Sequence, residues 1–249
     1  SSYQRPPHSP ALQASCYTRS TRDNNRDTLI MKVQARLLRL EANPQGRDFV
    51  VGDIHGHVSK LMDQLKQRQF NPEYDRVICV GDLIDRGPES PQALALLDQP
   101  WFYSVLGNHE YLMVCAMKYK QSEQRMTWLS HGGDWIASTS PSDWPGWFDK
   151  IEQLPLAIEV TGKTGTRYGI IHAEYPFSDW ADIEQLDADE ALRTIWSRAQ
   201  FQQRSEQVID GIDVVIHGHN ISDGELHLGN RMYIEPGVYL GKDFIIKEL

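Results

Sequence analysis

The most constraining stretch of the sequence is an apolar run that ends directly in charged residues. Residues 77–80 read Val-Ile-Cys-Val, and residues 81–87 read Gly-Asp-Leu-Ile-Asp-Arg-Gly. A β-branched run predicts a buried strand, and open α/β sheets bind their ligands at the carboxyl ends of strands. Asp82, Asp85 and Arg86 are therefore expected at the carboxyl end of a strand, next to a ligand.

Two other stretches repeat this arrangement. Residues 49–51 lead into Gly-Asp-Ile-His-Gly at residues 52–56, and residues 102–106 lead into Gly-Asn-His-Glu at residues 107–110. The first loop is followed by apolar residues at i, i+3, i+4 and i+7 from residue 58, the spacing of one helical face. Successive strand, loop and helix units imply parallel strands joined by helical crossovers.

The second half of the chain predicts a different pairing. Residues 156–160 and 168–171 flank a Gly-rich turn, which predicts a hairpin whose second strand ends at His172. A strand at residues 214–216 then leads into His217, Gly218 and His219. Further predicted elements are helices at 89–97, 110–120 and 187–204, strands at 232–234 and 244–246, and an edge strand or short helix within 32–40. More antiparallel pairing is expected here, so the fold class is α/β, with two mixed β-sheets packed as a sandwich and flanked by helices.

The domain organisation follows from composition along the chain. Residues 1–30 are rich in proline and polar residues without an apolar period, which predicts a disordered extension with Met31 as a candidate start. Residues 31–249 are expected to form a single catalytic domain. Residues 121–153 contain four of the seven tryptophans, and we interpret them as a satellite core or as a rim that shapes access to a cleft.

Composition excludes several classes of partner. The formal net charge of −9 argues against general affinity for nucleic acid or anionic membranes, which recruit excess Lys and Arg. Three cysteines without Cys-x-x-Cys spacing indicate neither a disulfide framework nor a thiolate zinc site, and they fit a reducing cytoplasm. The sequence has no apolar run near the roughly 20 residues that span a bilayer. The expected protein is cytoplasmic, and a monomer is assumed.

Carboxylate, amide and imidazole groups follow the predicted strands and suit divalent Mn, Fe or Zn. The set consists of Asp53, His55, Asp82, Asn108, His172 and His219. Helix capping or turn formation could explain each aspartate alone, but not why histidines and an asparagine also follow apolar runs. Six ligands with one bridging carboxylate, for which Asp82 is the natural choice, suit two metals about 3.5–4 Å apart.

In this order and spacing, the motifs resemble those of the phosphoprotein phosphatase family of calcineurin-like metallophosphoesterases, most closely its bacterial and bacteriophage serine/threonine phosphatases. The resemblance runs from about residue 49 to the C-terminus and includes Gly-Gly-Asp-Trp at residues 132–135. It implies the αββα metallophosphoesterase fold and a dinuclear site at the strand ends. One metal would be held by Asp53, His55 and Asp82, and the other by Asp82, Asn108, His172 and His219.

The same resemblance implies a mechanism. A metal-bridging hydroxide would attack phosphorus directly, without a phosphoenzyme. His109 resembles the general acid that protonates the leaving oxygen, and Asp85 resembles the carboxylate that orients it. The residues that resemble the family's phosphate-binding groups are Arg86, Asn108 and Arg198, with Arg193 as the alternative to Arg198. The expected substrates are phosphoserine and phosphothreonine proteins, with phosphotyrosine as a further one, and Mn²⁺ is the expected metal, with Fe or Zn²⁺ as alternatives.

Two alternatives remain at this stage. A symmetrical dinucleoside polyphosphate hydrolase resembles the chain in its first and third motifs, but that branch usually lacks an acidic residue at the position of Asp85 and has Asp at that of Glu110. A metal-binding module without activity is the non-enzymatic alternative. Glu110 is interpreted as a helix-starting residue and His217 as a structural one. The remaining histidines are not expected to bind metal: His8, His57, His131 and His227.

Overall fold

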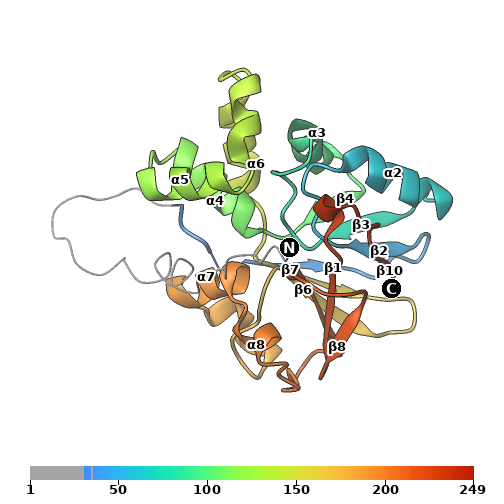
Figure 1. Ribbon diagram of the computed structural model, residues 1–249. Coiled ribbons are helices and arrows are strands. Elements are labelled where there is room, and N and C mark those ends of the chain that lie inside the picture. The colour runs from blue at the N-terminus through green and yellow to red at the C-terminus, as the bar shows by residue number, and fades with distance from the viewer. Residues whose placement is uncertain (1–30, 35) are drawn as a thin grey trace, which may run out of the picture.

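Two β-sheets pack face to face, and helices cover the outer side of each (Figure 1). The computed structural model describes residues 31–34 and 36–249. The disorder predicted for residues 1–30 lies outside the described residues. This arrangement confirms the predicted sandwich of two mixed sheets flanked by helices.

The smaller sheet contains the three strands that the sequence predicted to carry polar residues at their carboxyl ends. Its strand order is β10-β2-β3-β4. These strands are β10 (Ile246–Glu248), β2 (Asp48–Val51), β3 (Arg76–Cys79) and β4 (Phe102–Ser104). β2, β3 and β4 pair in parallel, as predicted, whereas β10 is antiparallel to β2. The helices that follow these strands are α2 (Val58–Gln67), α3 (Ser90–Ala95) and α4 (Asn108–Met117).

The larger sheet has six strands in the order β1-β5-β6-β7-β9-β8. They are β1 (Leu37–Leu40), β5 (Ala157–Thr161), β6 (Arg167–Ile171), β7 (Val214–Ile221), β9 (Arg231–Glu235) and β8 (Leu226–Leu228). The expected antiparallel pairing holds for β5 with β6 and for β8 with β9. In contrast, β6, β7 and β9 pair in parallel. Their carboxyl ends therefore lie together at one edge of the larger sheet, as those of β2, β3 and β4 do in the smaller sheet.

An apolar core lies between the sheets. The smaller sheet contributes buried side chains such as Val50 and Ile78, and the larger contributes Ile158, Ile170 and Ile216. Separate cores lie beneath the helices on each outer face. Because both sheets are covered on both faces, their central strands are nearly continuous apolar runs. Among the described residues, none of the helices has the length and apolar content needed to cross a bilayer.

The helical region predicted for residues 187–204 is interrupted. It forms α7 (Ala188–Trp196) and α8 (Ala199–Gln202), with Ser197 and Arg198 between them. Asp187 caps α7 by accepting a hydrogen bond from the Glu190 amide, and the Glu190 side chain accepts one from the Asp187 amide. The break between the helices brings Arg198 to the end of β7, because its guanidinium donates to the His219 carbonyl at 2.9 Å.

The Trp-rich segment, residues 121–153, forms a helical layer beside α4 (Figure 1). It consists of α5 (Ser122–Ser130), a 3₁₀ helix at Gly133–Ser138 and α6 (Trp144–Glu152). Trp128 is completely buried, and a Cβ at Gly133 would lie only 2.5 Å from its ring atoms. The residue at position 133 must therefore be glycine for the indole to occupy this place.

Candidate metal and phosphoryl-transfer site

Loops from both sheets bring six polar side chains to the strand ends. Each of these side chains is at most 6% exposed, so the cluster is largely shielded from water. The smaller sheet supplies Asp53, His55, Asp82 and Asn108, and the larger supplies His172 and His219. Asp82 lies at the centre, since side chains from three other elements approach its carboxylate.

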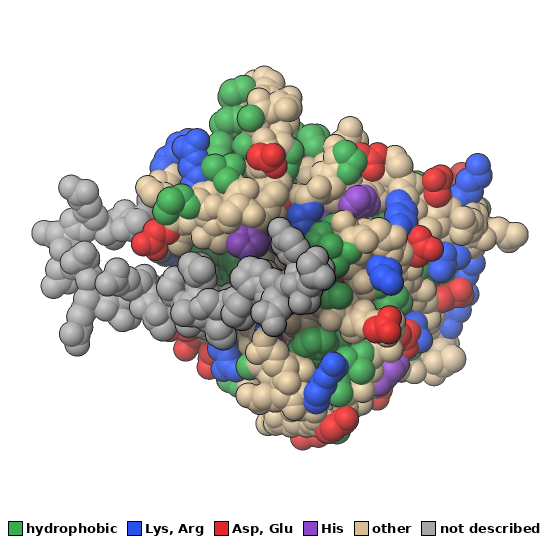
Figure 2. Space-filling view, in the orientation of Figure 1, with side chains coloured by type: hydrophobic (Ala, Val, Ile, Leu, Met, Phe, Trp, Pro, Cys, Tyr) green, Lys and Arg blue, Asp and Glu red, His purple; other side chains and the backbone are tan. Residues whose placement is uncertain are grey.

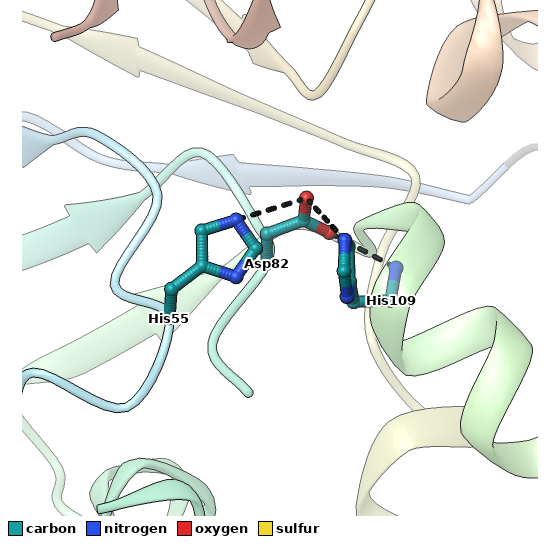
Figure 3. Close-up of side chains that lie close together, drawn as sticks. All are labelled: His55, Asp82 and His109. Carbon is teal, nitrogen blue, oxygen red and sulfur yellow. Dashed lines mark hydrogen bonds and ion pairs between the residues drawn. The ribbon is translucent and has the colours of Figure 1, made fainter. Parts of the chain in front are cut away.

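On one side of Asp82, two imidazoles face its carboxylate (Figure 3). The Nε2 atom of His55 lies 3.7 Å from Asp82 Oδ2 and 3.8 Å from Asp53 Oδ2. The Nε2 atom of His109 lies 4.0 Å from Asp82 Oδ2. One group of possible ligand atoms therefore comes from His55, Asp82 and His109, all within 4.8 Å of one another.

On the other side, the larger sheet completes a second group. His172 Nε2 lies 3.3 Å from Asp82 Oδ2 and 3.0 Å from Asn108 Oδ1. The His219 ring lies 4.9 Å from the His172 ring, centroid to centroid. Ligand atoms of Asp82, His172 and His219 again fall within 4.8 Å of one another. The structure thus brings together all six side chains singled out in the sequence.

Each of the three candidate ligand histidines, His55, His172 and His219, has one ring nitrogen within hydrogen-bonding distance of a backbone carbonyl. His55 Nδ1 pairs with the Ile84 carbonyl at 2.9 Å, and His172 Nδ1 pairs with that of Val80 at 2.7 Å. His219 instead uses Nε2, which lies 3.1 Å from the Trp196 carbonyl. Such carbonyl contacts orient metal-ligating imidazoles and leave the opposite nitrogen for the metal. The donor set therefore fits divalent cations.

Electrostatics support the same fit. Burial, with the neighbouring carboxylates of Glu235 and Asp82, raises the pKa of Asp53 well above its usual value. Burial also lowers the pKa of His55 and His219 well below the usual range, so both rings are neutral near pH 7. Neutral imidazoles are the metal-binding form, and a cation would relieve the repulsion between the buried carboxylates.

Two buried glutamates brace the loops that carry these ligands. Glu110 is in the first turn of α4, as predicted, but its carboxylate also accepts hydrogen bonds from four amides, those of Asp82, Leu83, Ile84 and Gly107, at 2.6–3.3 Å. Glu235, at the end of β9, accepts from the Asp53 amide at 3.0 Å. Burial raises the pKa of Glu110 to about 8 and that of Glu235 to about 7. Neither brace was predicted from the sequence, although Glu110 closes the third motif.

The loop backbones are strained where the ligands attach. Five non-glycine residues around the site have positive φ angles between 43° and 75°: His55, Asp82, Asp85, Arg86 and His219. Residues other than glycine adopt this region rarely, and such strain concentrates at functional sites. The braces and the packing of the two sheets hold these conformations in place.

A second constellation, beside the first, contains Asp85 and His109. Asp85 Oδ2 lies 2.6 Å from His109 Nδ1. Burial lowers the pKa of His109 to about 4 and raises that of Asp85 well above its usual value, because it disfavours charge on either partner. Two unprotonated acceptor atoms would repel each other at this distance, so one proton must lie between them. The Asp85 carboxylate also accepts from two indoles, Trp128 Nε1 at 2.8 Å and Trp135 Nε1 at 2.7 Å.

Two arginines lie near the cluster. The exposed Arg86 follows Asp85, and its guanidinium lies 4.1 Å from the centre of the Tyr239 ring. Arg198 donates to Asn220 Oδ1 at 2.9 Å and is attracted by Asp53 and Asp82, whereas burial lowers its pKa. Arg193, the rival, is paired with Glu174 at 3.2 Å. On the face seen in Figure 2, histidine and basic side chains reach the surface near the middle of the molecule.

The other histidines occupy different surroundings. His217 is buried on β7, where Nδ1 pairs with the Ile171 carbonyl at 3.0 Å and the ring stacks on Tyr233. His131 is on the surface, as expected, yet its ring centre is 6.3 Å from that of His109. Tyr239 is a residue that the sequence analysis missed, and its ring edge contacts His55.

Comparisons with known proteins agree with this geometry. A family model described as calcineurin-like phosphoesterase matches residues 49–232. Serine/threonine-protein phosphatase 2 of Escherichia coli K12 is 38% identical over 206 residues, which cover 81% of this chain and 92% of that protein. A symmetrical bis(5'-nucleosyl)-tetraphosphatase of Pseudomonas syringae is 37% identical over only 75 residues, covering 29% of this chain and 26% of that protein. A solved protein serine/threonine phosphatase from Saccharomyces cerevisiae shares the fold, with a TM-score of 0.58, 16% identity and coverage of 80% of this chain and 70% of that one.

Gly218 provides a test of the donor set. A Cβ there would lie 2.1 Å from Asp53 Oδ1 and 2.4 Å from a Val80 methyl, so Gly218→Ala must displace the Asp53 carboxylate. We expect about ten-fold or greater loss of Mn²⁺ affinity, the size of effect seen for changes around metal ligands. Isothermal titration calorimetry measures this. Gly146→Ala is the matched control, because a Cβ there meets nothing within 4 Å, and unchanged affinity in Gly218→Ala would contradict Asp53 as a ligand.

Proposed function

Since the chain belongs to the calcineurin-like phosphoesterase family, we propose that it is a metal-dependent protein phosphatase that hydrolyses phosphoserine and phosphothreonine. The observation that carries this proposal is the buried Asp85–His109 pair beside the donor set around Asp82. An alkoxide is a poor leaving group, so hydrolysis of these esters needs a proton donor next to the phosphate. Phosphotyrosine is a further substrate that the same groups would accept.

Two divalent cations would be held by the donor set, and Mn²⁺ is the proposed metal. Asp53, His55 and Asp82 would hold one, and Asp82, Asn108, His172 and His219 the other. Bound there, the cations would acidify a water nucleophile and neutralise charge on the phosphoryl oxygens. The protein supplies oriented imidazoles, of which burial keeps His55 and His219 neutral, and neutral imidazoles favour binding of a cation over binding of protons.

His109 is the proposed general acid. With the proton shared between Asp85 Oδ2 and His109 Nδ1 on the carboxyl oxygen, the neutral ring carries its hydrogen on Nε2 and can donate it to the departing seryl or threonyl oxygen. As that proton leaves Nε2, the shared proton moves fully to Nδ1, which restores a neutral ring. Asp85 then remains as a carboxylate supported by its other hydrogen bonds. Asp85 thus orients His109 and supplies its proton.

Arg86, Arg198 and Asn108 are the proposed phosphate-binding residues. The Arg86 guanidinium is exposed at the mouth of the site and lies over the Tyr239 ring, which restricts its motion. Arg198 is held by the His219 carbonyl and Asn220, so its planar fork is oriented before substrate binds. Arg193 is less suited because Glu174 engages it.

Substrate preference separates the phosphatase from the dinucleotide hydrolase. With Mn²⁺ supplied, we expect the protein to release phosphate from a phosphoserine or phosphothreonine peptide at least ten-fold more efficiently, in kcat/KM, than it cleaves diadenosine tetraphosphate. The physical reason is the Asp85–His109 pair. It would protonate an alkoxide leaving group, whereas the phosphate that leaves from a phosphoanhydride needs such protonation much less. A preference for the dinucleotide would replace the proposed function with the alternative.

Removal of divalent cations tests the metal requirement. We expect dialysis against excess chelator to abolish phosphopeptide hydrolysis and added Mn²⁺ to restore it, since the nucleophile depends on the cations. Phosphate release is the measurement, and circular dichroism checks that the stripped protein stays folded. Full activity in excess chelator would reject the mechanism, and restoration by Fe or Zn²⁺ but not Mn²⁺ would change the assigned metal.

The role of His109 is tested through the leaving group. His109→Ala should lower kcat on a phosphoserine peptide by roughly 10²- to 10⁴-fold, the usual contribution of general acid catalysis. The loss on 4-nitrophenyl phosphate should be much smaller, because nitrophenolate leaves without a proton. Steady-state kinetics on both substrates give the comparison. Equal losses would remove His109 from the acid role while leaving the metal site intact.

A further inference from the structure

Two tryptophans of the Trp-rich segment converge on one carboxylate. Trp128 Nε1 donates to Asp85 Oδ2 at 2.8 Å, and Trp135 Nε1 donates to Asp85 Oδ1 at 2.7 Å. The two rings meet edge to face, with centroids 6.2 Å apart. They come from α5 and from the following 3₁₀ helix, 43 and 50 residues beyond Asp85 in the chain.

These bonds leave the Asp85 carboxylate little freedom to rotate. One oxygen accepts from Trp135, and the other accepts from Trp128 while it pairs with His109 Nδ1. An indole N–H is only a donor, so both oxygens must remain in place as acceptors. The Asp85 amide in turn donates to the Ser90 hydroxyl at 2.8 Å. The two indoles therefore hold the carboxylate whose Oδ2 contacts His109 Nδ1.

A purely packing role for these indoles accounts for less of the geometry. Buried tryptophans usually find some hydrogen-bond acceptor, and Trp144 of the same segment finds its own nearby in the Thr139 hydroxyl at 2.9 Å. Trp128 and Trp135 instead share a completely buried acidic group outside the segment. The segment also meets the second motif at a further point, where the Arg86 amide donates to the Gly132 carbonyl at 3.4 Å.

We propose that Trp128 and Trp135 are positioning residues that act on His109 through Asp85 and so couple residues 121–153 to protonation of the leaving group. This inference rests on the proposed acid role of His109. Residues 121–153 would then contribute to proton transfer and would not serve only as a satellite core or a cleft rim. Loss of either indole N–H should let the Asp85 carboxylate rotate. His109 Nε2 should then no longer point at the leaving oxygen.

The test replaces each indole by a ring without the N–H. Trp135→Phe and Trp128→Phe should each lower kcat on a phosphoserine peptide about ten-fold or more, the range for removal of a hydrogen bond to a charged group. They should lower kcat on 4-nitrophenyl phosphate by less than about three-fold and leave KM unchanged, since binding does not need the proton. Trp144→Phe, which loses the indole bond to Thr139 alone, is the matched control and should behave as the unaltered protein does.

A double-mutant comparison separates positioning from general damage. In the His109→Ala background, Trp135→Phe should cause no further loss on the phosphoserine peptide, because residues that act as one unit are not additive. Equal losses on both substrates, or a full further loss in that background, would overturn the inference. Absence of turnover by the unaltered protein on both substrates would instead reject the proposed function.

A spectroscopic measurement keeps the inference testable if Trp128→Phe does not fold. In protein labelled with ¹⁵N-tryptophan, Asp85→Asn should shift the indole N–H resonances of Trp128 and Trp135 and leave that of Trp144 unchanged. Trp135→Phe and Trp144→Phe assign their own resonances without Trp128→Phe, and Trp135 suits this purpose because it is only half-buried. Unmoved resonances for both residues would overturn the proposed link to Asp85 whatever the enzyme activity.

Discussion

The structure depends on the position of one buried carboxylate, that of Asp82. Its Oδ1 accepts from the His109 amide at 3.0 Å, and its Oδ2 lies 3.3–4.0 Å from the Nε2 atoms of His172, His55 and His109. Burial raises the pKa of this carboxylate, but the neighbouring imidazoles, His172 above all, lower it well below the usual range. Asp82 therefore stays ionised where water is excluded, which is what a ligand shared by two cations requires.

Holding Asp82 in this state requires the rest of the loops to be rigid. Its backbone has a positive φ of 53°, a strained conformation that the Glu110 carboxylate stabilises by accepting from the amides around it. Glu235, from the larger sheet, stabilises the Asp53 loop in the same way by accepting from the Asp53 amide. Buried carboxylates cost folding free energy unless they are hydrogen-bonded or paired, and the amides of these loops provide the hydrogen bonds that offset the burial of both glutamates.

The helical layer of residues 121–153 extends this network outward. Its indoles each donate to one oxygen of Asp85, and Asp85 in turn contacts His109 beside Asp82. One continuous chain of hydrogen bonds therefore runs from a Trp-rich surface layer to the centre of the site. In such a network each group is oriented by its neighbours, so the nitrogen of the proposed general acid is held as firmly as those of the proposed metal ligands.

Sequence alone determined the parallel strands at residues 49–51, 77–80 and 102–106, because apolar runs and the loops after them are local patterns. It also determined the six proposed ligands, since a strand end can lie at only one edge of its sheet. Tertiary structure decided the parallel register of β6, β7 and β9, the break that places Arg198 rather than Arg193 near the cluster, and the contacts of Glu235, Trp128 and Trp135. These contacts join residues 43 to 182 positions apart, and their partners are chosen by the packing of two sheets and a helical layer, which no local pattern of residues encodes.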